Sequence, residues 1–196
     1  MIDAETIRLY DARAGDYAQA NPSDTPDATL SAFIAALPDG ARVLDLGCGP
    51  GRAAGHMADA GLTVEAWDAS EAMIALADRH PDVVTRLADF EALDAEAAYA
   101  GIWANFSLLH APRAAMPGHL AAIRRALTPG GIAHLGLKEG TGSKRDTLGR
   151  LYTYYTEQEL SALMLEAGLS PGRFERGTDK GLDGVIAPWF TVTAHA

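Results

Sequence analysis

The sequence contains almost no cysteine and no long apolar run. Cys48 is the single cysteine among 196 residues, so the chain can form neither an internal disulfide nor a zinc site built on cysteines. No apolar stretch approaches the roughly 20 residues that a membrane-spanning helix needs. The opening segment MIDAETIRLYDARAGDY also lacks the basic start and unbroken apolar run of a secretory signal. We therefore expect a cytoplasmic protein with no membrane partner and no bound metal.

Positive charge is also scarce. The chain has 16 Lys and Arg residues against 26 Asp and Glu residues, which gives a formal net charge of −10, and no dense basic run offsets it. A polyanion would be repelled over most of such a surface, so we expect no nucleic-acid partner. Hydrophobic residues make up 48% of the chain and charged residues 21%, which is typical of a globular protein. The oligomeric state stays open.

The chain does contain a regular alternation of short apolar runs and helix-length segments. After two helices at residues 3–20 and 27–37, this alternation predicts right-handed crossovers and a doubly wound α/β fold with a mostly parallel sheet. A last helix is predicted up to residue 167, followed by two strand candidates near residues 173–176 and 189–193. The alternating part predicts strands at residues 42–46, 63–67, 83–87, 101–106 and 132–138, and helices at 52–60, 71–79 and 117–127.

A glycine-rich loop follows the first predicted strand. Residues 43–51 read VLDLGCGPG, and the carboxyl end of such a strand is where ligands approach in open α/β sheets. A shifted register over residues 49–54, GPGRAA, satisfies the glycine-to-alanine form of the dinucleotide fingerprint, but it leaves Gly47 and Cys48 between strand and motif. Asp68, at the end of the second strand, can accept hydrogen bonds from ribose hydroxyls in either class of cofactor.

Five segments occur in this order along the chain: DLGCGPG, VEAWDAS, LADF, GIWANFSLLHAP and LTPGG. Together they resemble the motifs of the class I S-adenosylmethionine-dependent methyltransferases. The resemblance covers residues 42–168 and is closest to small bacterial enzymes that act on small molecules, a group that includes tellurite-resistance-like enzymes. It implies a Rossmann-like, seven-stranded, mostly parallel sheet whose last strand is antiparallel, with helices on both faces. Because proline cannot donate in a ladder, we expect that strand to begin at or after Pro188.

The resemblance also implies a cofactor, S-adenosylmethionine, and one domain over residues 1–196. Within it, a helical cap (1–40) precedes the cofactor-binding core (41–138) and a substrate side (139–196). Tyr10 and Tyr17 lie seven apart on one helix face, a spacing that a core stripe would produce equally. The implied cofactor residues are Gly47, Cys48 and Gly49 along the methionyl group, Asp68 at the ribose, Ala69 and Met73 as apolar walls, Asp89 and Phe90 at the adenine, Asn105 at the methionyl ammonium and Tyr17 at its carboxylate.

The acceptor side is less defined by sequence. His110 follows the fourth strand beside the expected methyl site, where it would act as a general base or only position its turn. Lys138 and Arg150 are candidate anchors for an anionic acceptor, and Tyr154 belongs to an aromatic cluster that would close over it. The glycines and charges of residues 138–146 predict a mobile loop before this cluster. The alternative is an exposed loop whose Tyr152, Tyr154 and Tyr155 pack on the sheet edge.

These observations predict in-line transfer of a methyl group from S-adenosylmethionine to a small-molecule acceptor. Two alternatives remain open at this point. The first is a nicotinamide-dependent reductase that uses the shifted glycine register, and the second is a non-catalytic module that binds S-adenosylmethionine. The sequence identifies neither the acceptor nor its reacting atom, because substrate contacts in such folds come from variable loops.

Overall fold

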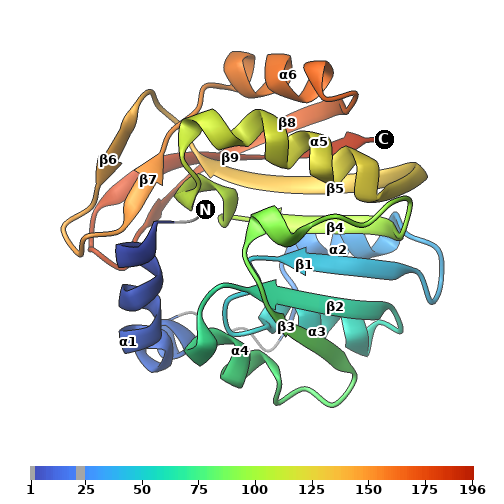
Figure 1. Cartoon of the computed structure of the whole chain (residues 1–196), viewed down its shortest axis with the longest axis horizontal. Coiled ribbons are helices and arrows are strands. Elements are labelled where there is room, and N and C mark those ends of the chain that lie inside the picture. Colours follow the sequence, from blue (N-terminus) through green and yellow to red (C-terminus); the bar gives the residue numbers. More distant parts are fainter. Residues whose placement is uncertain (1–2, 21–24) are drawn as a thin grey trace.

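The computed structural model describes residues 3–20 and 25–196. Two helices, α1 (Ala4–Ala20) and α2 (Ala28–Ala35), precede the sheet, and the remaining helices follow individual strands (Figure 1). No helix in this described part is long and apolar enough to span a bilayer. The strands are β1 (Arg42–Leu46), β2 (Thr63–Asp68), β3 (Val83–Leu87), β4 (Tyr99–Asn105), β5 (Leu127–Lys138), β6 (Ser143–Arg145), β7 (Leu151–Thr153), β8 (Ser170–Lys180) and β9 (Ile186–His195). The other helices are α3 (Arg52–Asp59), α4 (Glu71–Ala77), α5 (Met116–Ala126) and α6 (Glu157–Glu166).

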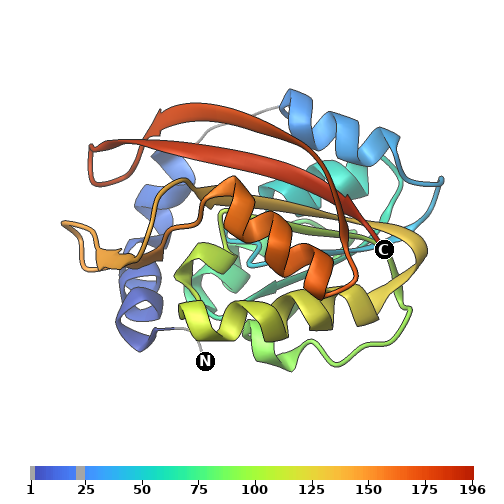
Figure 2. The same ribbon diagram turned by 90° about the horizontal axis from the view of Figure 1, so that it is seen from above.

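Seven strands form the central sheet in the order β3-β2-β1-β4-β5-β9-β8. The first five pair in parallel, and β9 runs antiparallel to β5. Helices α5 and α6 cover one face of the sheet, while α2 and α3 cover the other (Figure 2). The predicted seven-stranded, doubly wound sheet with an antiparallel last strand is therefore confirmed.

Strand β1 owes its central position to its sequence. Val43, Leu44 and Leu46 are each at most 1% exposed, as expected of a parallel strand covered on both faces. It pairs with β2 on one side and with β4 on the other. Since parallel strands end at the same edge, the loops after β1, β2 and β4 converge there, and α1 stands beyond that edge (Figure 1).

The structure corrects two expectations on the substrate side. Residues 138–146, expected as a mobile loop, contain β6, which pairs with β7 in an antiparallel hairpin. Strand β9 begins at Ile186 rather than at or after Pro188. Proline fits inside this strand because its carbonyl accepts from the Glu139 backbone N–H at 3.0 Å. The nitrogen of Pro188 faces β5, as its carbonyl does. The missing N–H therefore removes no hydrogen bond between β9 and β8.

Candidate active site

A cavity of about 220 Å³ lies between α1 and the carboxyl ends of β1, β2 and β4. It is the site that the glycine-rich loop and its neighbours predict. The predicted cofactor residues that line it are Tyr17, Gly47, Cys48, Gly49, Asp68, Ala69, Met73, Phe90 and Asn105. Asp89 is the one member of that set outside the lining, and its Oδ1 instead accepts from the Glu91 backbone N–H at 3.0 Å.

The three glycines of the loop have different neighbours, although each has a positive φ. A Cβ at Gly47 would stand 2.3 Å from the Cβ of Ser107, and one at Gly51 would stand 2.6 Å from the Cβ of Ala77 in α4. At Gly49, an added Cβ would meet only the Tyr17 ring, at 3.8 Å. Protein packing therefore requires the outer glycines, while Gly49 leaves bare backbone facing the cavity.

Asp68 fastens this loop to the end of β2. Its Oδ2 accepts from the Gly49 backbone N–H at 2.8 Å, and its Oδ1 accepts from the Ser70 backbone N–H at 2.9 Å. Burial raises the pKa of Asp68, while these backbone hydrogen bonds oppose that rise. Each carboxylate oxygen has a further lone pair, so the side chain can also accept from hydroxyls of a ligand in the cavity.

Two charged side chains of the cavity were not assigned a role from the sequence. Asp45, on β1, is 2% exposed, and its Oδ2 is buried without a hydrogen-bond partner. Arg52, the first residue of α3, has a buried Nη1 without a partner, while its Nη2 donates to the Ala18 carbonyl of α1. One cavity thus contains an anion and a cation that each have an unsatisfied atom, an arrangement complementary to the zwitterion of an amino acid.

Burial also changes the protonation of Asp45. Desolvation raises its pKa to about 7, the charge of Asp68 adds to that rise, and a backbone hydrogen bond from Ala54 opposes it. A ligand ammonium beside Oδ2 would favour the ionised form. The sequence offers one signal for this role, which is the position of Asp45 two residues before the first glycine. A buried strand residue at that position is equally typical of the protein core.

A second cavity of about 500 Å³ adjoins the first and shares Tyr10, Tyr17, Phe106 and His110 with it. Three of the predicted acceptor residues, His110, Lys138 and Arg150, line it. Tyr154 does not, and its ring packs instead against Gly140. Tyr152 of β7, which belongs to the aromatic cluster predicted to close over a substrate, also lines it, whereas sequence reasoning missed the turn between β8 and β9 and Trp189.

Phe106 stands where the two cavities meet. Its φ of +54° is in the left-handed region, which bulky side chains rarely adopt. A backbone hydrogen bond to the Gly136 carbonyl at 2.9 Å and an edge contact with the Trp189 ring at 5.9 Å hold it there. Such a backbone conformation is typical of functional sites, where surrounding contacts compensate for the strain.

His110 is fully engaged by protein partners. Its Nδ1 lies 2.7 Å from the Leu151 carbonyl oxygen, and its Nε2 lies 2.8 Å from the Tyr10 hydroxyl oxygen. Because a carbonyl can only accept, we assign the proton to Nδ1, and Nε2 then accepts from Tyr10. Burial lowers the pKa of His110 to about 4, so the ring is neutral at physiological pH and positions Tyr10.

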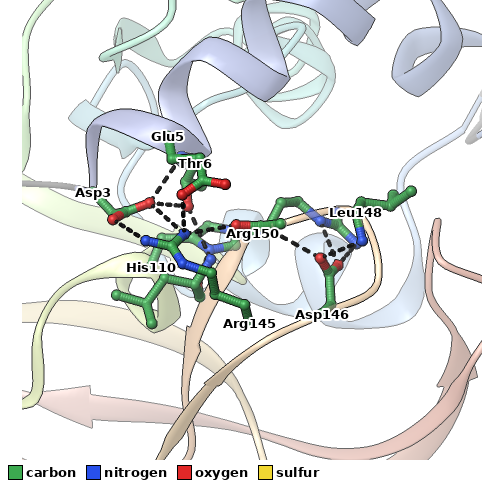
Figure 3. A network of polar contacts seen from close by, with 10 residues as sticks. Asp3, Glu5, Thr6, His110, Arg145, Asp146, Leu148 and Arg150 are labelled. Atoms are coloured by element: carbon green, nitrogen blue, oxygen red, sulfur yellow. Dashed lines mark hydrogen bonds and ion pairs between the residues drawn. The ribbon is translucent and has the colours of Figure 1, made fainter.

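A polar network ties the β6–β7 hairpin to α1 (Figure 3). Arg145 donates to Asp3 at 2.8 and 2.9 Å, and these hydrogen bonds hold the pKa of Asp3 well below its usual range. The Leu151 backbone N–H donates to the Thr6 hydroxyl at 2.9 Å. Arg150 pairs with Asp146 inside the hairpin at 2.7 Å and also reaches the Tyr10 hydroxyl at 3.4 Å. The same helix therefore covers the first cavity and borders the second.

The Tyr10→Phe variant tests this network. Removing the hydroxyl leaves the buried Nε2 of His110 without its donor, so we expect the free energy of unfolding to fall by about 1–2 kcal/mol. Urea unfolding followed by circular dichroism measures the change. Tyr154→Phe is the matched control, since it removes a hydroxyl outside both cavities and should leave stability nearly unchanged. Equal losses in the two variants would contradict the role of Tyr10.

Comparisons with known proteins agree with this geometry. Residues 43–131 match a family model described as a methyltransferase domain. A Burkholderia thailandensis 1,6-didemethyltoxoflavin-N1-methyltransferase, solved with 1,6-didemethyltoxoflavin and S-adenosylhomocysteine, is 26% identical with a TM-score of 0.76, over 98% of this chain and 87% of that one. No curated protein matches the chain.

More distant structures share the fold. TehB from Haemophilus influenzae is 17% identical with a TM-score of 0.74, over 93% of this chain and 66% of that one. The [4+2]-cyclase SpnF is also 17% identical, with a TM-score of 0.73, over 96% of this chain and 94% of that one. At this level of identity, these two structures support the fold and not a shared activity.

The domain match and the sheet order define a methyltransferase. More particularly, residues 43–131 match a methyltransferase domain and contain the five motifs that resemble those of the class I S-adenosylmethionine-dependent enzymes, whose fold the chain shares. The matches favour this class over the nicotinamide-dependent reductase that the shifted glycine register leaves open.

Proposed function

We propose that the chain transfers the methyl group of S-adenosylmethionine to a small-molecule acceptor by in-line displacement. The observation that carries this proposal is the pair of adjoining cavities with a common wall of Tyr10, Tyr17, Phe106 and His110. The first takes the cofactor and the second the acceptor, so the two ligands would meet at that wall. In this scheme, the cap (1–40) and core (41–138) hold the cofactor, and residues 139–196 complete the acceptor side.

The chemistry of the first cavity fits the cofactor. The unpartnered atoms of Asp45 and Arg52 match the methionyl ammonium and carboxylate, and Asp68 matches the ribose hydroxyls. Gly49 leaves room for the methionyl chain, and Met73 and Phe90 offer apolar contacts to the adenine. When bound, S-adenosylmethionine supplies an electrophilic methyl group on a sulfonium.

The contribution of the protein to this reaction is alignment in a closed site. Methyl transfer needs acceptor, methyl carbon and sulfur in line, and well-oriented reactants reach effective molarities of about 10⁵–10⁸ M. A base is needed only when the acceptor must lose its proton during transfer. His110, neutral and bonded at both nitrogens, is suited to holding Tyr10 in the wall between the two ligands.

The acceptor is proposed to be a small molecule for two reasons. The second cavity has a volume within the range of small-molecule pockets, about 300–1,000 Å³. The Burkholderia thailandensis methyltransferase, similar along nearly the whole chain, was solved with 1,6-didemethyltoxoflavin bound. The likeness to a [4+2]-cyclase makes a direct activity test necessary, because that fold also carries a different reaction.

Two measurements test the proposal. Calorimetry with S-adenosylhomocysteine should show binding, and absence of heat at concentrations far above micromolar would contradict it. Incubation of a cell extract with methyl-labelled S-adenosylmethionine should transfer label to low-molecular-weight compounds. Label found only in macromolecules would contradict a small acceptor, and no transfer despite cofactor binding would favour a non-catalytic binding module.

Asp45 makes cofactor binding dependent on pH. Its pKa of about 7 in the free protein should fall when the methionyl ammonium binds, so binding below pH 7 releases a proton. We therefore expect the affinity for S-adenosylhomocysteine to decrease as the pH falls below 7, by up to about tenfold per pH unit. Calorimetry in two buffers of different ionisation heat measures the released proton.

The Asp45→Asn variant, which cannot titrate, is the control for this prediction. It should bind S-adenosylhomocysteine more weakly at pH 8 and show no proton release near pH 6. An unchanged proton release in Asp45→Asn would assign the titration to another group.

A further inference from the structure

We propose that the acceptor is a planar aromatic compound that binds as its anion, with the charge held by the Lys138 ammonium. This inference rests on the proposed function and adds the substrate class. It draws on three features of the second cavity, which are its aromatic lining, its charges and the engaged state of its described histidine.

Aromatic side chains line this cavity from separate elements. Tyr10 and Tyr17 come from α1, Tyr152 from β7, Phe106 from the end of β4 and Trp189 from β9. Tyr10 and Tyr17 contact edge to face with centroids 5.8 Å apart, and Phe106 and Trp189 do so at 5.9 Å. Rings prefer offset stacks and edge contacts, so a flat aromatic ligand gains contacts here that an aliphatic ligand of the same volume does not.

Lys138 is the half-buried cation of this cavity that we expect to bind a ligand. It lies at the end of β5, half-buried, with its Nζ 4.0 Å from the centroid of the Tyr152 ring. No carboxylate of the described residues lies within ion-pair distance of that ammonium. Burial lowers the pKa of Lys138, and the charges around it act in both directions, since Asp183 and Asp146 raise this pKa whereas Arg150 and Lys144 lower it.

The other charges of the cavity largely cancel. The Arg150 guanidinium is paired with Asp146 in the interior. Asp179 and Lys180 are both exposed at the rim, one of each sign. In the turn between β8 and β9, Asp183 raises the pKa of Lys138 from a distance, while one of its oxygens accepts from the Val185 backbone N–H at 3.1 Å. Among the described residues, the Lys138 ammonium therefore has no ion-pair partner in the interior, and Asp183 opposes its charge only from farther away.

Neither the histidine nor the tyrosines with raised pKa values, among the described residues of this cavity, are suited to take a proton from the acceptor. His110 is neutral with both nitrogens bonded, and burial raises the pKa of both Tyr10 and Tyr152. An acceptor with an acidic O–H or N–H group needs no base, because it loses its proton to solvent before it binds. Its anionic oxygen or nitrogen then forms the bond to the methyl carbon while the carbon–sulfur pair returns to sulfur, which leaves a neutral methylated product and S-adenosylhomocysteine.

Binding of 4-nitrophenol to protein saturated with S-adenosylhomocysteine tests the inference, with nitrobenzene as the uncharged probe of the same ring. Absorption titration of the wild type should show nitrophenolate binding and an apparent pKa of the bound phenol about one unit lower than in solution. Lys138→Met should weaken nitrophenolate binding about tenfold and leave nitrobenzene binding within about twofold. Lys138→Arg should retain most of the nitrophenolate affinity.

Lys144→Met is the matched control, since Lys144 also lies over a tyrosine ring, 5.3 Å from that of Tyr154, but outside the cavity. It should bind both probes as the wild type does. The inference is overturned if nitrophenolate does not bind, binds Lys138→Met as tightly as the wild type, or binds no better than nitrobenzene. Calorimetry with S-adenosylhomocysteine on the same samples separates the two proposals, because loss of that binding would contradict the proposed function instead.

Discussion

Replacing Asp68 by Ala is expected to weaken S-adenosylhomocysteine binding about 100-fold. The carboxylate is positioned to accept from the ribose hydroxyls, and two charge-assisted hydrogen bonds at about 1.5 kcal/mol each amount to roughly 3 kcal/mol. The same change frees the Gly49 backbone N–H, which Asp68 binds at 2.8 Å, so the loop under the methionyl chain loses its anchor as well. Isothermal titration calorimetry at pH 8 measures the effect.

Asp82→Ala is the matched control because it removes a carboxylate that is exposed and outside the cavity. It should bind S-adenosylhomocysteine as the wild type does. The assignment of Asp68 to the ribose fails if Asp68→Ala binds within about threefold of this control while remaining folded by circular dichroism.

The Gly51→Ala variant should lose about 2–5 kcal/mol of unfolding free energy. The backbone at Gly51 has φ +79°, which is strained by about 1–2 kcal/mol for a residue with a Cβ. The added methyl would also stand 2.6 Å from the Cβ of Ala77, and overpacking of this kind adds about 1–3 kcal/mol. Urea unfolding measures the loss, and the position lies outside both cavities.

Gly61→Ala separates the two contributions. Gly61 has φ +87°, but a Cβ added to this residue would have no neighbour within 4 Å. This variant should lose only the conformational part, about 1–2 kcal/mol. Equal losses at Gly51 and Gly61 would show that the contact between α3 and α4 tolerates the methyl group, and the packing argument would then be wrong.

The cofactor side of the molecule could be predicted from sequence because its signals are local. A buried strand, a turn that needs positive φ and a helix follow one another within residues 42–59, and each leaves a distinct residue pattern. Parallel strands then bring Gly49, Asp68, Phe90 and Asn105 to the same edge of the sheet without any knowledge of side-chain contacts. The fold and most of the lining of the first cavity follow from these local patterns and from the direction of the strands.

The acceptor side could not be predicted in the same way because its contacts join distant segments. Tyr10 meets His110 across 100 residues, and Leu151 meets Thr6 across 145. The short hairpin β6–β7 carries little hydrophobic alternation, so its charges and glycines favour an exposed loop when read alone. Its order comes from the pairs that Arg145 and Arg150 form with Asp3 and Asp146.

Asp89 illustrates the limit of transferring a motif by position. The segment LADF is present, and Phe90 lines the cavity, yet the Asp89 carboxylate caps the short turn Phe90–Ala92. A contact to the adenine amino group remains a prediction for this residue. The backbone after β3 is placed as the motif requires, whereas the direction of one carboxylate depends on local hydrogen bonds that the motif does not encode.

The ties between α1 and the β6–β7 hairpin have one more consequence. Helix α1 covers the proposed cofactor cavity and lines the proposed acceptor cavity. Its N-terminal end is held by hydrogen bonds from Arg145 and Leu151. A displacement of α1 would therefore expose both cavities to solvent at the same time. Entry of the acceptor and exclusion of water from the cofactor site therefore depend on the same short helix.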